Sequence, residues 1–169
     1  VELLVKAVAE ARQRSERPIH AVLVGDGPGK PAAEMRAREL GVKDLVHFIG
    51  RVPMNEVPDW LAAADAAVLP DCTDIITPIK VQEYMALGLP TVVPDYPANR
   101  EVLENERTGL LFTPRSVDAI CNALLRLAST PELCKEIGEA AGRLARERFT
   151  WESTWGKALG DIGLRIGAG

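Results

Sequence analysis

Short apolar runs alternate along this chain with longer segments in which apolar residues recur every three or four positions. Runs of the first kind, rich in valine, isoleucine and leucine, are typical of strands that are buried on both faces. They occupy residues 19–25, 45–50, 66–70, 91–93 and 109–112. Segments of the second kind predict helices over residues 2–14, 32–40, 55–63 and 79–87, and from 117 to 160 with breaks near Pro131 and Thr150. This alternation predicts an α/β protein with a Rossmann-like, doubly wound parallel sheet flanked by helices, followed by a helical C-terminal tail.

The length and composition predict one folded domain. A chain of 169 residues with 47% apolar content is long enough to bury a sizeable core. We assign residues 1–150 to this domain and residues 151–169 to the tail, where two tryptophans four residues apart give one apolar face. The chain starts at Val1, inside a helical pattern, so we expect it to be a segment of a larger protein.

Charge and cysteine usage exclude several classes of protein. The 20 basic and 24 acidic residues are interspersed and give a net charge of -4, so no basic face indicates a nucleic-acid partner. The three cysteines form no C-x-x-C pair and the two histidines lie far apart in sequence, so we expect neither a disulfide framework nor a zinc site. The lack of a disulfide framework fits a reducing, cytoplasmic setting. No apolar run approaches the ~20 residues of a membrane span, and no signal-peptide pattern opens the chain, so we expect no transmembrane anchor within this segment.

Ligands of open parallel sheets bind beyond the carboxyl ends of the strands, so the loops there are the places to look for a site. The loop after the first strand reads GDGPGK. It is not the dinucleotide fingerprint, because Lys30 replaces the third glycine, and it is not a Walker loop, because Pro31 follows the lysine. Two interpretations remain open: Gly25 and Gly27 let the backbone approach a ligand, or they form a tight turn.

The helix predicted after the third strand carries the strongest chemical signal. Thr77 is a good N-cap, Pro78 suits the first helical position, and Gly88 ends the helix. Free amides at such a helix start attract anions, and Lys80 and Glu83 lie three residues apart on one face. This arrangement can hold a phosphate at one end and hydroxyls at the other, but it also fits a surface helix with a solvated lysine and glutamate.

Two further loops carry polar candidates. Arg51 follows the second strand and can reach a phosphate or stack on a base, although a plain surface arginine has the same sequence context. Asp71 and Asp74 precede the helix start, where paired carboxylates can act as acid and base or bind sugar hydroxyls, but aspartate is also common before helix caps. No nucleophile has an adjacent histidine, so a hydrolase triad is unsupported.

Four blocks of the sequence, taken in order, resemble the carboxyl-terminal, donor-binding half of the family-four (group one) glycosyltransferases, which have the GT-B fold. The blocks are AVLVGDGP, ARELGVKDLVHFIGRVPMNEVPDWLAAADAAVLP, PIKVQEYMALGLPTVVPD and EVLENERTGLLF, and the resemblance runs from about residue 1 to residue 150. The order and spacing of the blocks are much more specific than any single motif.

The resemblance implies transfer of a sugar from a nucleotide-activated donor, such as a UDP or GDP sugar, to an acceptor with retention of configuration. It implies no cofactor and no bound metal, since the nucleotide sugar is a substrate. The implied partners are the nucleotide-diphosphate sugar and the acceptor-binding N-terminal domain of the parent chain. Peripheral association of the parent protein with a membrane is a further implication. Because that domain lies upstream, we expect residues 1–169 alone to be inactive.

The resemblance also implies roles for individual residues. Glu83 would lie in a buried pocket and bind the ribose hydroxyls, the backbone around Arg51 and Val52 would line the base, and Gly27 would lie opposite across the cleft. The diphosphate would be held by the helix start and the lysine behind it, namely Thr77, Pro78, Ile79 and Lys80.

One departure from the family pattern affects the sugar contacts. The family often has a second glutamate eight positions before Glu83, where this chain has Ile75, and Asp74 next to it is the candidate replacement. Two other interpretations stay open: a sugar-nucleotide epimerase or phosphorylase of the same architecture, although no catalytic histidine or cofactor-lysine segment supports it, and a non-catalytic α/β interaction module.

Overall fold

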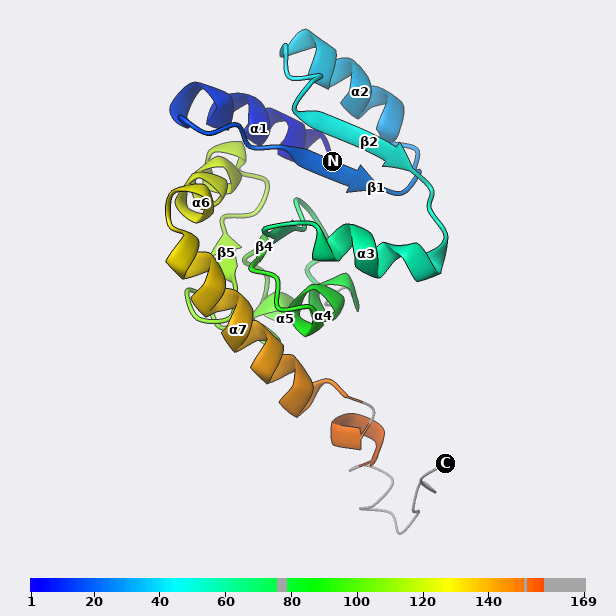
Figure 1. The fold of residues 1–169 in the computed structure, drawn as a ribbon, viewed down its shortest axis with the longest axis vertical. Coiled ribbons are helices and arrows are strands. Elements are labelled where there is room, and N and C mark those ends of the chain that lie inside the picture. The colour runs from blue at the N-terminus through cyan, green and yellow to red at the C-terminus, as the bar shows by residue number, and fades with distance from the viewer. Residues whose placement is uncertain (76–78, 151, 157–169) are drawn as a thin grey trace.

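The computed structural model describes residues 1–75, 79–150 and 152–156, and helices and strands alternate along it (Figure 1). The strands are β1 (Ala21–Val24), β2 (Val46–Gly50), β3 (Ala67–Val68), β4 (Thr91–Pro94) and β5 (Leu110–Phe112). The helices are α1 (Glu2–Arg14), α2 (Lys30–Glu39), α3 (Val57–Ala62), α4 (Ile79–Ala86), α5 (Pro97–Arg100), α6 (Val117–Ser129) and α7 (Pro131–Arg148). A 3-10 turn, η1 (Met54–Glu56), precedes α3, and a π-helical turn, η2 (Glu152–Gly156), follows α7. The five predicted strands and the helices predicted before residue 150 are confirmed.

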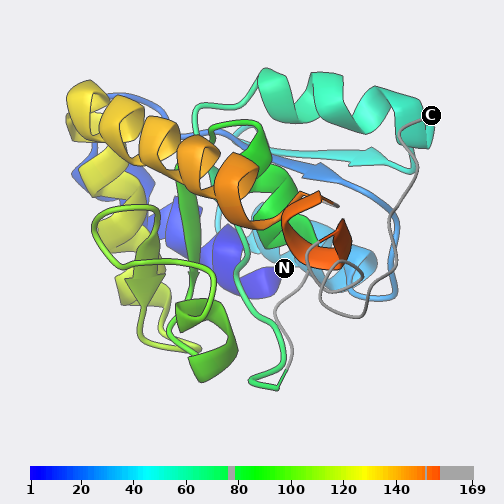
Figure 2. The same cartoon turned by 90° about the horizontal axis from the view of Figure 1, so that it is seen from below.

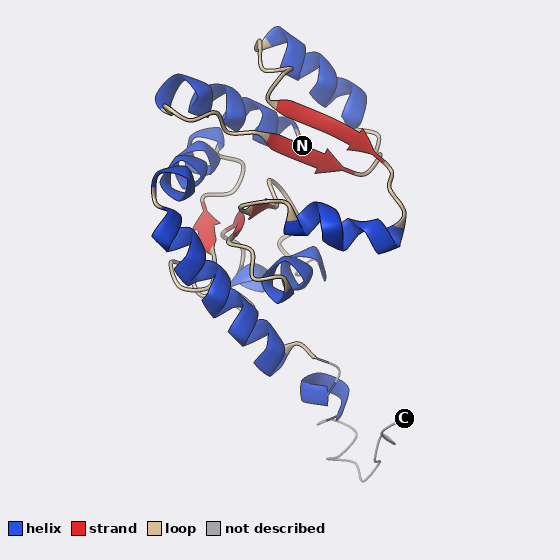
Figure 3. Cartoon of the chain, in the orientation of Figure 1, coloured by secondary structure: helices blue, strands red, loops and turns tan. Residues whose placement is uncertain are grey.

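The strands are parallel, as predicted, but they form two sheets where we expected one. β1 pairs with β2, and Ala21 lies opposite Val46 in the register. β3, β4 and β5 form the second sheet in that order, with β4 in the centre. Figure 3 shows these two groups of strands. The difference arises because, among the described strands, no ladder of backbone hydrogen bonds joins β1 to β3.

Helices cover both sides of the β1–β2 pair. α1 packs against α2 and β1, and α2 packs against β2, while α3 lies on the other side of the two strands (Figure 2). Along α1, buried side chains recur at the helical period at Leu4, Val5, Val8 and Ala11. This face packs against α6, and together they form a core that also contains residues of both sheets.

A second, smaller core lies between α4, α7 and β4. Val81 and Met85 of α4 are fully buried there beside Val93, and Ala141 of α7 completes the contact. All four residues of β4 are buried, as is expected for the central strand of a sheet that is covered on both faces. This packing holds α4 immediately beyond the loop that follows β3.

The sequence pattern did not predict α5, because four residues are too few to show a helical period. The predicted break at Pro131 is confirmed, with α6 ending at Ser129. Most of the predicted tail lies outside the described residues, so the division at residue 150 stays a prediction. Among the described helices, none has the length and apolarity that a bilayer span requires.

Candidate functional site

The loops after β1 and β2 meet at the carboxyl ends of these strands. The N–H of Gly25 donates to the carbonyl oxygen of Gly50 at 2.7 Å, and both glycines have a positive φ, +122° and +82°. Residues that carry a side chain rarely adopt a backbone conformation with positive φ, so both positions favour glycine. The contact brings the two loops side by side, while approach of the Gly25 backbone to a ligand stays a prediction.

Gly27 lies in open space beside the Gly25–Gly50 contact. A Cβ atom added to Gly27 would meet no atom within 4 Å, whereas one added to Gly50 would lie 3.6 Å from Nζ of Lys30. That ammonium is also 3.7 Å from a carboxylate oxygen of Asp26. The loop thus presents an accessible backbone with a half-buried cation next to it, so Gly27 stays a candidate for ligand contact.

Arg51 and Val52 follow directly after β2. The side chain of Arg51 is exposed and Val52 is half-buried. Within the described residues Arg51 has no hydrogen-bonded or ion-paired partner. Its position next to the Gly25–Gly50 contact places it beside the first loop, so the guanidinium is available to a ligand there.

Pairing of β1 with β2 also brings His20 and His47 together. Nδ1 of His20 lies 3.0 Å from Nε2 of His47, and the two rings are stacked. Their distance in sequence gave no indication of this contact, which depends on the pairing of the two strands. The part of the chain that the structure describes holds no cluster of three or more possible metal-binding side chains.

The side chain of Asn99 in α5 contacts both the loop after β3 and the end of β4. The Asn99 side chain is 1% exposed, and its Nδ2 donates to the Pro94 carbonyl oxygen at 2.8 Å and lies 3.6 Å from Sγ of Cys72. Burial raises the pKa of the Cys72 thiol; the Asn99 contact opposes this, and the nearby carboxylates of Asp71 and Asp74 add to it. A raised pKa favours the protonated thiol, which is the less nucleophilic form.

Asn99 was missed in the sequence because an asparagine in a short loop looks like a turn residue. The Pro97 that precedes it, a proline at a helix start, was the available signal for α5. Asp74 is exposed in the same loop as Cys72, which Asn99 contacts. Oδ1 of Asn99 is buried and has no hydrogen-bond partner among the described residues.

The polar residues of α4 lie on its solvent-facing side. Val81 and Met85 point into the core, so the opposite face carries Ile79, Lys80 and Glu83, all exposed. Lys80 and Glu83 therefore share one open face, as predicted, and neither has an ion-pair partner within the described residues. The expectation that Glu83 is buried in a pocket was wrong, because the buried side of the helix is taken by apolar side chains.

Thr77 and Pro78 lie outside the described residues. The roles predicted for them stay predictions, as does the N-cap. The structure thus arranges the other predicted residues in two groups: Gly27, Arg51 and Val52 at the end of the β1–β2 sheet, and Asp74, Ile79, Lys80 and Glu83 at α4 and the loop before it.

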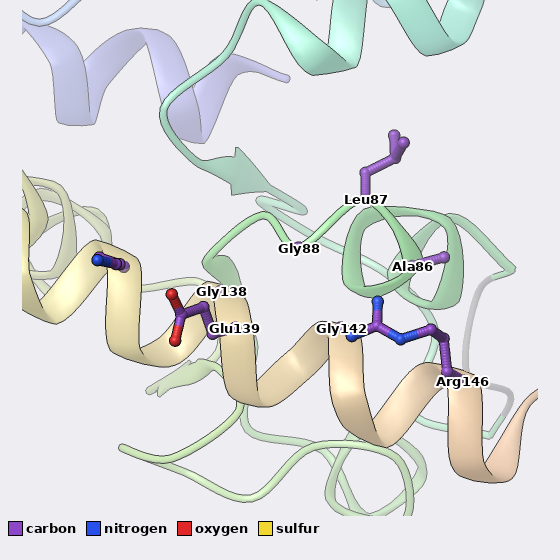
Figure 4. A pocket seen from close by; sticks show the side chains of 8 residues that line it. Ala86, Leu87, Gly88, Gly138, Glu139, Gly142 and Arg146 are labelled. Carbon is purple, nitrogen blue, oxygen red and sulfur yellow. The ribbon is translucent and has the colours of Figure 1, made fainter.

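The opposite end of α4 contacts α7 in an open groove of about 320 Å³ (Figure 4). Its walls are Ala86, Leu87, Gly88, Lys135, Gly138, Glu139, Gly142 and Arg146. None of the residues predicted to bind a ligand lies here, because the groove is at the C-terminal end of the helix. It results from the close approach of α7 to Gly88, which two glycines of α7 permit.

Asp95, directly after β4, forms a bidentate ion pair with Arg100. The guanidinium donates to both carboxylate oxygens, at 2.5 and 2.7 Å, and these bonds hold the pKa of Asp95 below its ordinary value. A carboxyl whose pKa is lowered in the folded protein stabilises it above the unfolded pKa of about 3.9. That contribution is lost as the pH falls through the lower, folded value.

We therefore expect Asp95→Asn to lower the free energy of unfolding slightly at pH 7, and this effect to shrink as the pH falls below the unfolded pKa. The effect is small because both side chains are partly exposed. Urea unfolding at several pH values measures it, with Arg100→Gln as the matched change. If Asp95→Asn still destabilises the protein in the Arg100→Gln background, the ion pair is not the cause.

Comparison with known proteins identifies the family. The family model described as glycosyl transferases group 1 matches residues 1–130. The chain is 32% identical over 146 residues to the MMP alpha-(1->4)-mannosyltransferase of Mycolicibacterium hassiacum, covering 86% of this chain and 35% of that protein. It is 27% identical over 159 residues to a GDP-mannose-dependent alpha-(1-6)-phosphatidylinositol monomannoside mannosyltransferase of Mycobacterium tuberculosis, covering 90% of this chain and 41% of that protein. The chain thus spans well under half the length of these relatives.

Solved structures show the same architecture. HepE of Anabaena in complex with UDP matches with a TM-score of 0.82 and 20% identity, over 93% of this chain and 44% of that chain. The C-terminal domain of LpcC, a group 1 family protein of Francisella tularensis, matches with a TM-score of 0.79 and 22% identity, over 88% of this chain and 78% of that chain. Together with the family match and the parallel α/β fold, these likenesses show that the chain belongs to the group 1 glycosyltransferases and has the architecture of one half of their GT-B fold.

Proposed function

We propose that this chain is the donor-binding half of a glycosyltransferase that transfers a sugar from a nucleotide-diphosphate sugar to an acceptor with retention of configuration. The observation that carries the proposal is the family match over residues 1–130, which includes α4 with its open face. A relative named for dependence on GDP-mannose and a solved structure with bound UDP support a nucleotide sugar as donor. Because one name gives GDP and the other gives UDP, these two comparisons do not favour one nucleotide base over the other.

The open face of α4 suits a nucleotide diphosphate. Lys80 is an exposed cation in the first turn of the helix, where the backbone amides also favour anions. Glu83 lies about one turn further along, and its carboxylate accepts hydrogen bonds from two neighbouring ribose hydroxyls. Both side chains are free of partners among the described residues, so binding a ligand costs neither of them an existing ion pair.

The loops of the β1–β2 sheet suit the remainder of the donor. The backbone at Arg51 and Val52 offers hydrogen-bond groups to a base, and the Arg51 guanidinium can stack on its ring. Gly27 leaves room for close approach of a phosphate or sugar. Asp74, exposed in the loop before α4, is the candidate for contact with sugar hydroxyls in place of the family's second glutamate.

The chemistry that this half contributes is stabilisation of the leaving group. Negative charge grows on the diphosphate as the glycosidic bond breaks, and fixed amides and a lysine aimed at that charge stabilise the transition state. The reaction proposed here uses no resident metal or cofactor. The acceptor and the remaining catalytic groups come from the other half of the parent protein, so residues 1–169 alone bind nucleotide but transfer no sugar.

Thermal unfolding in the presence of nucleotides tests this function. We expect UDP, GDP or ADP, or one of their sugars, to raise the melting temperature of the natural protein that contains this segment. A ligand at a hundred times its Kd adds about 2.7 kcal/mol to the free energy of unfolding. The same screen on residues 1–169 is expected to show a smaller shift with the same nucleotide. If no nucleotide shifts either protein, donor binding is excluded and the interaction module becomes the better interpretation.

A further inference from the structure

The loop that leads from β3 to α4 makes few polar contacts with the rest of the described chain. The N–H of Leu69 still donates to the Val92 carbonyl oxygen at 2.9 Å, which extends the pairing of β3 with β4 by one residue. Beyond it, the hydrogen bond that residues 70–75 make within the described part of the chain is the one from Nδ2 of Asn99 to Sγ of Cys72. The Cys72 side chain is half-buried, whereas those of its two neighbours in the chain are exposed. The contact with Asn99 is therefore the polar contact that can fix the position of this loop.

Asn99 belongs to a firmly held part of the structure. Its N–H donates to the Tyr96 carbonyl oxygen at 3.0 Å, and its carbonyl oxygen accepts from the N–H of Leu103 at 2.9 Å. Leu103 is 2% exposed and lies in the core that α4 and α7 share. The Asn99 carboxamide is thus presented to Cys72 from a fixed position.

The orientation of this carboxamide follows from its partners. The Pro94 carbonyl oxygen can only accept a hydrogen bond, so the Asn99 atom at 2.8 Å from it is the amide nitrogen. The second hydrogen of the same nitrogen is then available to the sulfur of Cys72. Exchanging the two ends of the amide would place two acceptor oxygens against each other. Oδ1 is therefore the atom that is left buried without a partner among the described residues.

Stability of the core gives no reason for an asparagine at this position. A buried oxygen without a partner costs free energy on folding, and a leucine of similar shape would not carry that cost. The Pro94 carbonyl oxygen does not depend on Asn99, because it also accepts from the N–H of Tyr96 at 2.8 Å. An apolar side chain could not, however, supply a donor to Cys72. The carboxamide thus serves the loop that carries Cys72.

We propose that Asn99 is a positioning residue of the donor site: by holding Cys72 it sets the place of residues 70–75, and with it the position from which the Asp74 carboxylate meets the sugar of the donor. This inference rests on the donor-binding function proposed above. Asp74 is two residues from Cys72, which is at most about 7 Å of extended chain, so a displacement of Cys72 also moves Asp74. Asn99 does not touch the ligand and acts through Cys72.

This role concerns one part of the donor only. The nucleotide diphosphate is assigned to α4, whose position is set by the packing of Val81 and Met85 in the core. The sugar is assigned to Asp74, whose position depends on Asn99. A change at Asn99 should therefore separate binding of the sugar from binding of the nucleotide.

Titration of the natural full-length protein with a nucleotide and with its sugar tests this separation. The pairs are UDP with UDP-glucose, GDP with GDP-mannose and ADP with ADP-glucose, and the pair that binds is used. We expect Asn99→Leu to weaken binding of the nucleotide sugar about tenfold, because a hydrogen bond to the Asp74 carboxylate is misplaced, and to leave binding of the free nucleotide within about twofold. A residue that only stabilised the fold would not change the ratio of the two affinities.

Cys72 supplies the matched variants. Cys72→Ser keeps an acceptor for the Asn99 amide and should retain the wild-type ratio, whereas Cys72→Ala removes the acceptor and should lower the ratio as Asn99→Leu does. Combining Asn99→Leu with Cys72→Ala should cause no further loss, because both changes break the same contact. The Cys72 variants also decide the question if Asn99→Leu does not fold.

The results that would overturn the inference differ from those that would overturn the function. If the wild type prefers the nucleotide sugar and Cys72→Ala and Asn99→Leu keep that preference, Asn99 does not position the loop and donor binding stands. A equal loss of both affinities would make Asn99 a residue of fold stability. If the wild type binds no member of the three pairs, the proposed donor binding fails and this inference fails with it.

Discussion

Replacing Glu83 by glutamine in the natural full-length protein is expected to weaken nucleotide binding and to lower kcat/KM for sugar transfer by roughly ten- to a hundredfold. A hydrogen bond to a charged group contributes about 1.5–3 kcal/mol, and the glutamine keeps one acceptor oxygen but loses the charge. The melting temperature should stay within about 1 °C of the wild type, because Glu83 is exposed and has no partner among the described residues. Isothermal titration with the preferred nucleotide and steady-state kinetics measure the two effects.

Glu136→Gln is the matched control for this experiment. Glu136 is an exposed helical glutamate on α7, and its replacement changes the net charge by the same amount. We expect it to leave binding and transfer unchanged. If Glu83→Gln behaves like Glu136→Gln, then Glu83 is a solvated surface residue and the proposed ribose contact is wrong.

Replacing Gly138 by alanine is expected to destabilise the protein by about 2 kcal/mol or more, as overpacking of a tight contact does. A Cβ atom at this position would overlap the carbonyl oxygen of Gly88 and would lie 3.3 Å from Cδ of Pro90. The obstructing atoms belong to backbone and to a proline ring, so α7 must move away from α4. For a chain of this length, the expected fall in melting temperature is about 4–8 °C.

Gly142→Ala, one turn further along α7, is the matched control. Its added Cβ would lie 3.3 Å from the end of the Arg146 side chain and 3.5 Å from Cα of Gly88. A flexible side chain can move aside, and alanine favours the helix by about 1 kcal/mol over glycine. We therefore expect this variant to be as stable as the wild type or slightly more stable. Equal melting temperatures for the two variants would show that α7 does not pack closely against Gly88.

Many of the elements of this fold were predictable from local sequence. A strand that is buried on both faces must be apolar throughout, and a helix packed on one side must repeat its apolar residues at the helical period. Both patterns are visible in single segments, such as residues 45–50 for β2 and 2–14 for α1. The positions of Lys80 and Glu83 on one face of α4 follow from the same helical geometry.

Features that depend on contacts between distant segments were not predictable in this way. His20 contacts His47, and Asn99 contacts Cys72. Both contacts depend on which strands and loops become neighbours in the fold. The exposure of Glu83 is a similar case, because a resemblance to a ligand-bound family implies a pocket, whereas the packing of Val81 and Met85 decides which side of α4 faces the solvent.

Local patterning is enough to specify an α/β chain with five parallel-type strands, because each pattern reflects the burial of a single element. The division of those strands into two sheets, the free edges of β1 and β3 and the contact between Gly88 and Gly138 were decided by the folded structure. They depend on hydrogen bonds and atomic overlaps between residues that are far apart in sequence, and such interactions leave no periodic trace in the chain.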